Sequence, residues 1–269
     1  MISLNATGAT SAASYYLDQN NRNLQKSLAK LSSGFRINSA VDDPGGLAVS
    51  MKLSASIRRT DAVITNVGNA LSFLQSQDGV LQVASNILLR MSELSTLASD
   101  AVLSSDITLY NTEFQELKGN MQDLLGEEFN GAPLFAVGGS TLAVVTSENG
   151  QTAGITKLNL DGVENTVTGI AGITTTALAT AATATLDTAI QALSVLQATN
   201  GAEQARMTFA QDILAVNRIN LEAANSRIMD VDIAEESTNY ARLRIIQEAG
   251  LAVLAQANTS TYSLLRLLE

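Results

Sequence analysis

The chain has 269 residues, and 16 Lys and Arg against 26 Asp and Glu give it a net charge of -10, which disfavours binding to the phosphates of nucleic acids. It contains no cysteine and no histidine, which excludes disulfides, thiol nucleophiles, histidine bases and the commonest metal ligand. No window holds the roughly 18 to 20 apolar residues that a membrane span needs, and the first positive charge, Arg22, comes too late for a secretory signal.

The N-terminal part of the chain predicts a helix that pairs with another helix. Residues 1–17 carry no charged side chain, so we do not expect them to form a solvated tail. Two lines of residues with a seven-residue spacing form the 3–4 alternation of a coiled-coil seam: Leu17, Leu24 and Leu31 in one line, and Asn21, Leu28 and Phe35 in the other. Asn21 is the candidate for a buried polar residue that fixes the register of the seam.

A break separates this helix from the next one. Asp43 suits a helix cap and Pro44 suits the first helical turn, where its missing N–H costs nothing. We therefore expect the first helix to end near Asn38 and a second to begin near Pro44. The apolar spacing then predicts one long helix over residues 44–99.

The middle of the chain contains a shorter helix and then a change of pattern. Apolar residues spaced between 110 and 124 predict a third helix, with Ser105 or Asp106 as its cap and Gly126 as its stop. Residues 130–182 are richer in Gly, Thr and Val. The runs TLAVVTS and GITKLNL, joined through ENGQTA, predict a β-hairpin, while the Ala/Thr stretch at 174–185 stays ambiguous.

The second half predicts two further helices. Apolar residues keep a 3–4 step from 186 to 231, with Asn200-Gly201 as the weakest point, and Asp232 with Glu235 indicates a new capped helix. Residues 249–265 carry no charge. The last helix has two apolar lines, a stripe too broad for one partner helix: Leu243, Ile246, Gly250, Val253, Ala257, Ser260, Leu264 and Leu267 in one, and Leu251, Leu254, Asn258, Leu265 and Leu268 in the other.

The two breaks lie at matching distances, about forty residues from each end of the chain. The sequence therefore predicts a mainly α fold, a long-helix coiled-coil bundle with a small β-hairpin region, built as discontinuous domains with the N- and C-termini paired. Residues 1–42 and 232–269 form the predicted terminal domain. Residues 43–231 form the predicted rod domain, with the hairpin and irregular region at about 130–182.

Few residues indicate chemistry. The acidic pairs Glu127-Glu128 and Glu235-Glu236 lie at predicted helix ends, where solvation or capping explains them. The glycine pair at 138–139 lacks the Lys-Ser/Thr or GxGxxG context of a phosphate loop. The chain is therefore not expected to be an enzyme or to bind a metal or cofactor.

Two segments closely resemble bacterial flagellins. The stretch LAKLSSGFRINSAVDDPGGLAVS at 28–50 is similar to their N-terminal signature. The stretches NRINLEAANSRIMDVDIAEES at 217–237 and AGLAVLAQANTSTYSLLRLL at 249–268 are similar to their C-terminal signature. The resemblance weakens across about 136–182.

The resemblance implies a minimal two-domain flagellin, with the paired termini forming the filament core and no large outer domain. It implies a homo-polymer that is secreted through type III export into the extracellular filament, with an export chaperone, a cap protein and hook-associated proteins as partners. The expected assembly residues are Leu17, Leu24, Leu28, Leu31, Leu243, Ile246, Val253, Leu264, Leu265, Leu267 and Leu268.

The resemblance also implies contact with a vertebrate Toll-like receptor through Arg90, Glu93, Leu94 and Glu113. Packing of one subunit against another is the simpler explanation of these four residues. Two other functions stay open at this stage. A hook–filament junction protein would share the terminal helices, and an enzyme-bearing variant would need the HExxH motif that a chain without histidine cannot form.

Overall fold

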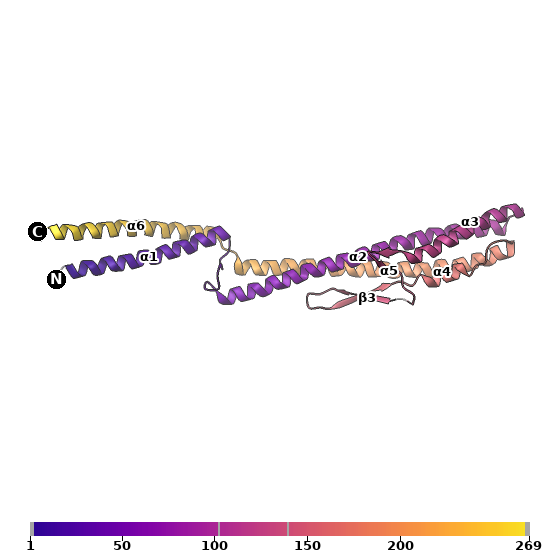
Figure 1. Cartoon of the computed structure of the whole chain (residues 1–269), viewed down its shortest axis with the longest axis horizontal. Helices are drawn as coiled ribbons and strands as arrows, with labels where there is room; N and C mark the ends of the chain where they lie inside the picture. The colour runs from indigo at the N-terminus through magenta and orange to yellow at the C-terminus, as the bar shows by residue number, and fades with distance from the viewer. Residues whose placement is uncertain (1–2, 102, 139, 267–269) are drawn as a thin grey trace. The chain divides into compact units, whose positions relative to one another are not determined.

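The computed structural model describes residues 3–101, 103–138 and 140–266, and the side chains of residues 10–259 within these ranges. It is mainly α, which confirms the predicted fold class (Figure 1). The elements are α1 (Ser3–Ser33), α2 (Pro44–Ser99), α3 (Ser104–Asp123), the 3-10 turn η1 (Leu124–Gly126), β1 (Glu128–Phe129), β2 (Ala132–Pro133), β3 (Ser140–Val145), β4 (Thr152–Lys157), α4 (Asp161–Thr168), α5 (Thr176–Met229) and α6 (Ile233–Arg266).

The chain forms two compact units. Unit 1 contains the described residues up to Ile57 and from Asn220 onward, and unit 2 is Arg58–Ile219. The division lies inside α2 and α5, whereas the sequence placed it at the two helix breaks. The functional domain boundaries at 42–43 and 231–232 therefore stay a prediction.

Both helix starts in unit 1 have the predicted caps. The Asp43 carboxylate accepts a hydrogen bond of 2.8 Å from the backbone N–H of Gly46, and α2 begins at Pro44. The Asp232 carboxylate accepts bonds of 2.9 and 3.2 Å from the N–H groups of Ala234 and Glu235. Each cap satisfies N–H groups that have no partner inside the helix.

The first helix ends at Ser33, five residues before the predicted end near Asn38. Gly34 adopts φ +77°, and its N–H donates to the Lys30 carbonyl at 2.9 Å, which closes the helix in the way glycine commonly does. The segments after α1 and α5 then meet in an antiparallel bridge between Phe35 and Asp230. This bridge joins the two breaks that the sequence predicted separately.

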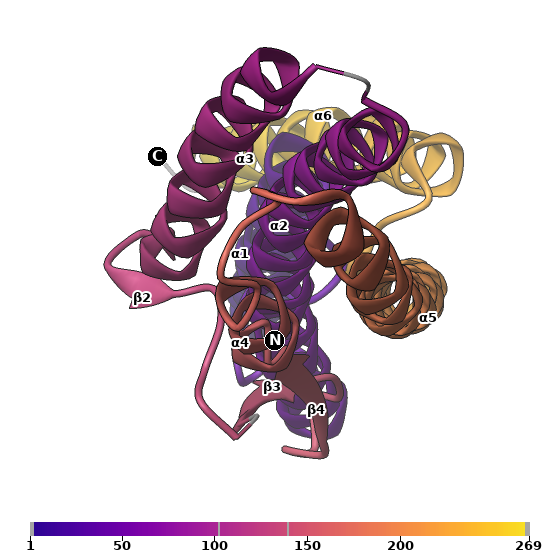
Figure 2. The ribbon, with the colours of Figure 1, turned by 90° about the vertical axis from the view of Figure 1, so that its right-hand side faces the viewer.

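The core of unit 2 lies between α2, α3 and α5, with the hairpins and α4 against it (Figure 2). Its largest fully buried side chains include Leu74, Leu81, Leu88, Met91, Phe114, Met121, Ile155, Leu186 and Leu193. α5 begins at Thr176, so most of the ambiguous Ala/Thr stretch is helical, and it continues through Asn200-Gly201 without a break.

A polar contact explains why α5 continues there. The fully buried Asn200 amide donates to the Leu74 carbonyl at 3.1 Å and to the Gln77 side chain at 3.2 Å, and it accepts a bond of 2.7 Å from Gln204. The hydrogen bonds of Asn200 therefore hold α5 against α2 at the position where Gly201 lowers the helix propensity.

α3 begins at Ser104, two or three residues before the start that a cap at Ser105 or Asp106 predicts, and without that cap. Its N-cap is Leu103, which makes no side-chain capping bond, so neither Ser105 nor Asp106 serves this role. One side of α3 instead holds the segment after α4. Gln115 and Lys118 donate to the carbonyls of Ala171 and Ile170 at 3.1 and 2.9 Å, and Asn111 accepts from the N–H of Ile173 at 2.9 Å.

The predicted hairpin is confirmed as β3 and β4, which pair antiparallel from Ser140↔Lys157 to Val145↔Thr152. α5 anchors β4. The Glu203 carboxylate accepts bonds of 2.9 and 2.6 Å from the N–H and hydroxyl of Thr156, and Arg206 donates to the Gly154 carbonyl. The sequence did not predict α4 or the short β1–β2 hairpin, which closes through Asn130-Gly131 with both residues at positive φ.

Candidate functional site

The candidate for function in the described residues is an exposed surface. Within them no group of three or more His, Cys, Asp or Glu could hold a metal ion. No helix in the described part of the chain is long and apolar enough to cross a membrane. The acidic pair Glu127-Glu128 is exposed beside β1, as a solvated pair would be.

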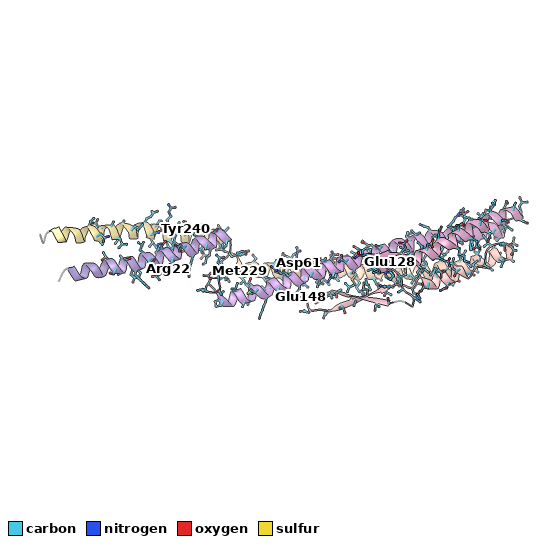
Figure 3. The ribbon with its side chains drawn as sticks, in the orientation of Figure 1. Arg22, Asp61, Glu128, Glu148, Met229 and Tyr240 are labelled. Atoms are coloured by element: carbon cyan, nitrogen blue, oxygen red, sulfur yellow. The ribbon has the colours of Figure 1, made fainter. Side chains whose placement is uncertain are left out.

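The paired terminal helices of unit 1 form the candidate site. α1 and α6 lie side by side, as their contacts show and as Figure 1 illustrates. Figure 3 marks the two helices with the labels Arg22 and Tyr240. This arrangement shows that the two ends of the chain pair with each other, as the sequence predicted.

The contacts between α1 and α6 include several polar ones. The side chain of Asn20 is only 8% exposed, and its amide donates to the Leu243 carbonyl at 2.9 Å. The Ser27 hydroxyl donates to the Glu236 carboxylate, and the Lys30 ammonium lies 3.8 Å from the same group. The sequence treated Glu236 as a solvated or capping residue, but it links the two helices.

The register of the α1 seam differs from the predicted one. Leu17, Leu24 and Leu31 are partly buried, but the residues that alternate with them are the buried Asn20 and Ser27, each one position before the predicted Asn21 and Leu28. Leu28 is 50% exposed and Phe35 is also exposed. Asn21 is therefore not the buried polar residue of this seam.

The α6 seam shows the same pattern. Leu243 is buried and Gly250 faces α1, where an added Cβ would lie 3.0 Å from Leu17. Ile246 and Val253 are exposed. Gln247 and Leu254 are half-buried in their place. For the tail, the side chains of Leu264 and Leu265 lie outside the described residues, as do Leu267 and Leu268 entirely.

Several apolar side chains of the two helices are exposed: Tyr15, Tyr16, Leu28, Ile245, Ile246, Leu251 and Val253. Three of them, Tyr16, Ile246 and Val253, line one cleft of about 180 Å³ between α1 and α6, together with Ala13, Leu17, Asn20 and Gly250, and form the exposed apolar face of the pair. An exposed apolar area with a cleft is typical of a surface that another chain covers.

Hydrogen bonds and a nearby positive charge keep one carboxyl group of the seam, that of Glu236, ionised. Burial alone would raise the pKa of the Glu236 carboxyl, but bonds from Ser27 and Asn239 and the charge of Lys30 outweigh it, so this pKa lies below its usual value. Glu236 is therefore ionised at neutral pH and keeps accepting both hydrogen bonds. Apolar periodicity cannot detect such a contact, and only the acidic side chain near the helix start signals it.

Three of the four residues expected to contact a receptor form a cluster on α2 and α3. The Arg90 guanidinium donates to both oxygens of Glu113, at 2.7 and 3.1 Å, and to Glu93 at 2.7 Å. The bonds from Arg90 lower the pKa of the Glu113 carboxyl. Arg90, Glu93 and Glu113 are exposed, whereas Leu94 is fully buried in the core and does not reach this surface.

Two family models match the chain over most of its length. Residues 4–141 match the bacterial flagellin N-terminal helical region, and residues 183–268 match the bacterial flagellin C-terminal helical region. The flagellar filament 33 kDa core protein of Treponema phagedenis is 34% identical, over 94% of this chain and 95% of its own length. A flagellin of Halalkalibacterium halodurans is also 34% identical, over 91% of this chain and 92% of its own.

Solved structures show the same relationship. The crystal structure of Bacillus cereus flagellin is 26% identical with a TM-score of 0.51, covering 55% of this chain and 88% of that one. A flagellar hook-associated protein from Vibrio parahaemolyticus superposes with a TM-score of 0.63, covering 70% of this chain and all of the other. At 14% identity this second match shows a shared fold alone.

Proposed function

The chain belongs to the bacterial flagellin family and is a structural subunit of a flagellar filament, and we propose that it polymerises through the exposed apolar face of α1 and α6. Flagellins are a structural protein family and not an enzyme family. The observation that carries the proposal is the exposure of Tyr16, Ile246 and Val253 at one cleft of unit 1. The seam uses Asn20, Ser27 and Glu236 with the buried Leu243, and it leaves these three side chains in water.

The energetics favour burial of this face between copies. Each large aliphatic side chain that moves from water into a packed environment contributes roughly 1.5–3 kcal/mol. The seam of the same copy leaves Tyr16, Ile246 and Val253 exposed, so a second copy would supply their cover. Contacts between unlike surfaces that do not close on themselves give an open helical filament.

The test is polymerisation of the purified chain under salting-out conditions, followed by negative-stain electron microscopy. Ile246→Glu and Val253→Glu place a charge at the cleft, and we expect each to abolish filaments at concentrations where the parent forms them. Ala241→Glu adds the same charge at another exposed position of α6 and is the matched control. Filaments from both cleft variants would contradict this assignment of the face.

We propose the same role for the leucines at the end of the chain. A variant that ends at Ser263 lacks Leu264, Leu265, Leu267 and Leu268, and we expect it not to polymerise. The inner filament domain would then consist of 1–42 and 232–269, and the rod domain of 43–231. Normal filaments from the truncated chain would show that the tail does not limit assembly.

We also propose the partners that accompany a secreted filament protein. These are the type III export chaperone, the cap protein and hook-associated proteins, and the shared fold with a hook-associated protein makes end-to-end packing against such a protein reasonable. A chain that forms no filaments alone but joins preformed ones would instead favour the junction protein.

The exposed cluster of Arg90, Glu93 and Glu113 supports a further proposal, contact with a vertebrate Toll-like receptor. Arg90→Ala should lower activation of receptor-bearing reporter cells at least about tenfold, since Arg is frequently a dominant interface residue. Arg218→Ala, which changes an arginine paired with Asp61, is the control and should have little effect. Equal activation by both variants would remove the cluster from the receptor contact.

A further inference from the structure

The chain contains three Asn-Gly pairs, at 130–131, 149–150 and 200–201, and each pair lies in a different kind of local structure. Asparagine is a chemically labile residue, and a following glycine makes it more so. Glycine has no Cβ, so its backbone nitrogen can approach the side-chain carbonyl of the preceding asparagine without steric hindrance. The attack also needs rotation of the asparagine backbone and side chain. The local structure therefore ranks the three pairs.

The pair in α5 is held away from this reaction. Asn200 is fully buried, and its amide donates to the Leu74 carbonyl and to the Gln77 side chain. Its side-chain oxygen accepts a hydrogen bond of 2.7 Å from Gln204. The helix continues through Gly201, so both the side chain and the backbone are fixed. A reaction at Asn200 requires local opening of α5 from α2.

The pair between β1 and β2 is exposed, but its backbone is fixed. Asn130 and Gly131 form a two-residue loop between the paired residues Phe129 and Ala132. Their φ angles are 52° and 76°. Two positive φ angles in a two-residue hairpin loop are typical of the type I′ turn, which prefers Asn-Gly. The pairing of the flanking residues therefore limits the rotation that the attack needs.

The pair between β3 and β4 is the least constrained of the three. Asn149 and Gly150 are exposed in the loop 146–151, and Figure 3 labels their neighbour Glu148 at the end of this hairpin. The N–H groups of Gly150 and Asn149 donate only within the loop, to the Ser147 carbonyl at 3.0 Å and the Ser147 hydroxyl at 3.3 Å. Among the described residues, none makes a hydrogen bond with the Asn149 side chain.

We propose that Asn149 is a site of spontaneous deamidation, that Asn130 reacts more slowly and that Asn200 reacts slowest. The Gly150 nitrogen loses its proton to water or hydroxide and bonds to the side-chain carbonyl carbon of Asn149. The bond from that carbon to the amide nitrogen breaks, and ammonia leaves. Water then opens the resulting succinimide at either carbonyl and gives aspartate or isoaspartate, so the net reaction consumes water and releases ammonia. The inference concerns unit 2 alone and does not depend on polymerisation.

Conversion at Asn149 should alter the end of the hairpin without unfolding unit 2. Both products add a negative charge. Isoaspartate also inserts a main-chain carbon before Gly150, so the turn bond to the Ser147 carbonyl cannot keep its geometry. β4 stays attached to α5 through the bonds from Thr156 to the Glu203 carboxylate. We therefore expect an unchanged helix content by circular dichroism and faster hydrogen exchange in the loop 146–151 of the isoaspartate form.

Ageing of the purified full-length chain tests the site. The chain is incubated in mildly alkaline buffer, sampled over time and digested, and the three Asn-Gly peptides are quantified by mass spectrometry, which separates acid from amide by mass. Enzymatic methylation of the isoaspartate carboxylate identifies that product. The rate constant at Asn149 should exceed that at Asn200 at least about tenfold, because Asn200 reacts only from a locally opened state. The rate constant at Asn130 should lie between them.

The same chain in concentrated urea is the matched control, because the three pairs keep their sequence and lose their structure. Their rate constants should then agree within about threefold, since an unfolded chain retains only fluctuating local structure. Asn149→Gln should abolish the reaction at this position, because the longer side chain would have to close a larger and less readily formed ring. It should leave the rates at Asn130 and Asn200 unchanged.

Three results would overturn the inference. The first is an equal rate at Asn149 and Asn200 in the folded chain. The second is a faster reaction at Asn130 than at Asn149. The third is the same ranking in urea, which would mean that neighbouring sequence and not the fold sets the rates. All three measurements use the free subunit, so the failure of this inference is distinct from a failure to polymerise.

Discussion

Replacement of Asn200 by Ala should destabilise unit 2. Asn200 is fully buried in the middle of α5 and connects three partners. Its amide N–H groups donate to the Leu74 carbonyl and the Gln77 side chain, and its oxygen accepts from Gln204. Gln77, itself fully buried, also donates to the Leu134 carbonyl at 2.9 Å.

The magnitude follows from the groups left without a partner. A buried polar group that loses its hydrogen bond costs about 1–3 kcal/mol. The change to Ala removes the hydrogen bonds that Asn200 makes with the Leu74 carbonyl and with the side chains of Gln77 and Gln204. Gln204 then keeps only a long contact of 3.5 Å to the Leu74 carbonyl. The better helix propensity of Ala offsets about 0.6 kcal/mol. We expect a net loss of about 2–4 kcal/mol in the free energy of unfolding.

Urea unfolding of the monomer, followed by circular dichroism, measures this loss. Asn217→Ala, at an exposed position of the same helix, is the control and should be neutral or stabilising by up to about 0.6 kcal/mol. The double variant Gln77→Leu/Asn200→Leu should lose less free energy of unfolding than the two single variants added together, because it removes both partners of the Asn200–Gln77 hydrogen bond. A loss below about 0.5 kcal/mol for Asn200→Ala would refute the reasoning.

Four further substitutions test other contacts. Gly172→Ala should lower the free energy of unfolding by about 1–3 kcal/mol, because φ at this residue is +151° and the new Cβ would lie 2.7 Å from the Asn111 side-chain oxygen. Gly119→Ala has open space around its new Cβ and should stabilise α3 by about 0.5–1 kcal/mol in the same urea titration. The lowered pKa of Glu236 contributes stability that is present above the ordinary glutamate pKa and is lost as pH falls through the folded-state value. The protection of α1 and α6 amides from hydrogen exchange, taken relative to the intrinsic exchange rate at each pH, should therefore fall on acidification, and Glu236→Gln should remove this pH dependence. Asp43→Ala should lower thermal stability by about 1 kcal/mol through loss of the α2 cap, and an unchanged melting temperature would contradict that role.

Local signals in the sequence predicted the helix ends best. The bounds of α2 at 44 and 99 agree with the prediction, as do the caps Asp43 and Asp232, because a cap depends on a few neighbouring atoms. The ends of α1 and α3 were less predictable. A glycine in the left-handed region ended α1 early, and Leu103 started α3 without any capping side chain.

The seam between α1 and α6 shows what periodicity cannot decide. A 3–4 pattern of leucines indicates a face that must be covered, but it does not say whether the same chain or another copy covers it. In this chain Asn20 and Ser27 occupy the internal seam, while Leu28, in the predicted line, is exposed. Leu94 shows a second limit of sequence reasoning. Its residue type matched a receptor contact, which would lie on the surface, but its side chain is buried in the core of unit 2.

The polar seam has a thermodynamic consequence for the free subunit. Heat capacity and denaturant sensitivity of an opening reaction both scale with the apolar surface that it exposes. Separation of α1 from α6 releases the polar contacts of Asn20, Ser27 and Glu236 and exposes Leu243 with the half-buried Leu17, Leu24 and Leu31, while Tyr16, Ile246 and Val253 are already in water. Because a two-helix pair buries few apolar side chains, it should open with a smaller heat-capacity change and a shallower urea dependence than the core of unit 2. Polymerisation, which would bury the exposed apolar face, should add a negative heat-capacity change of its own.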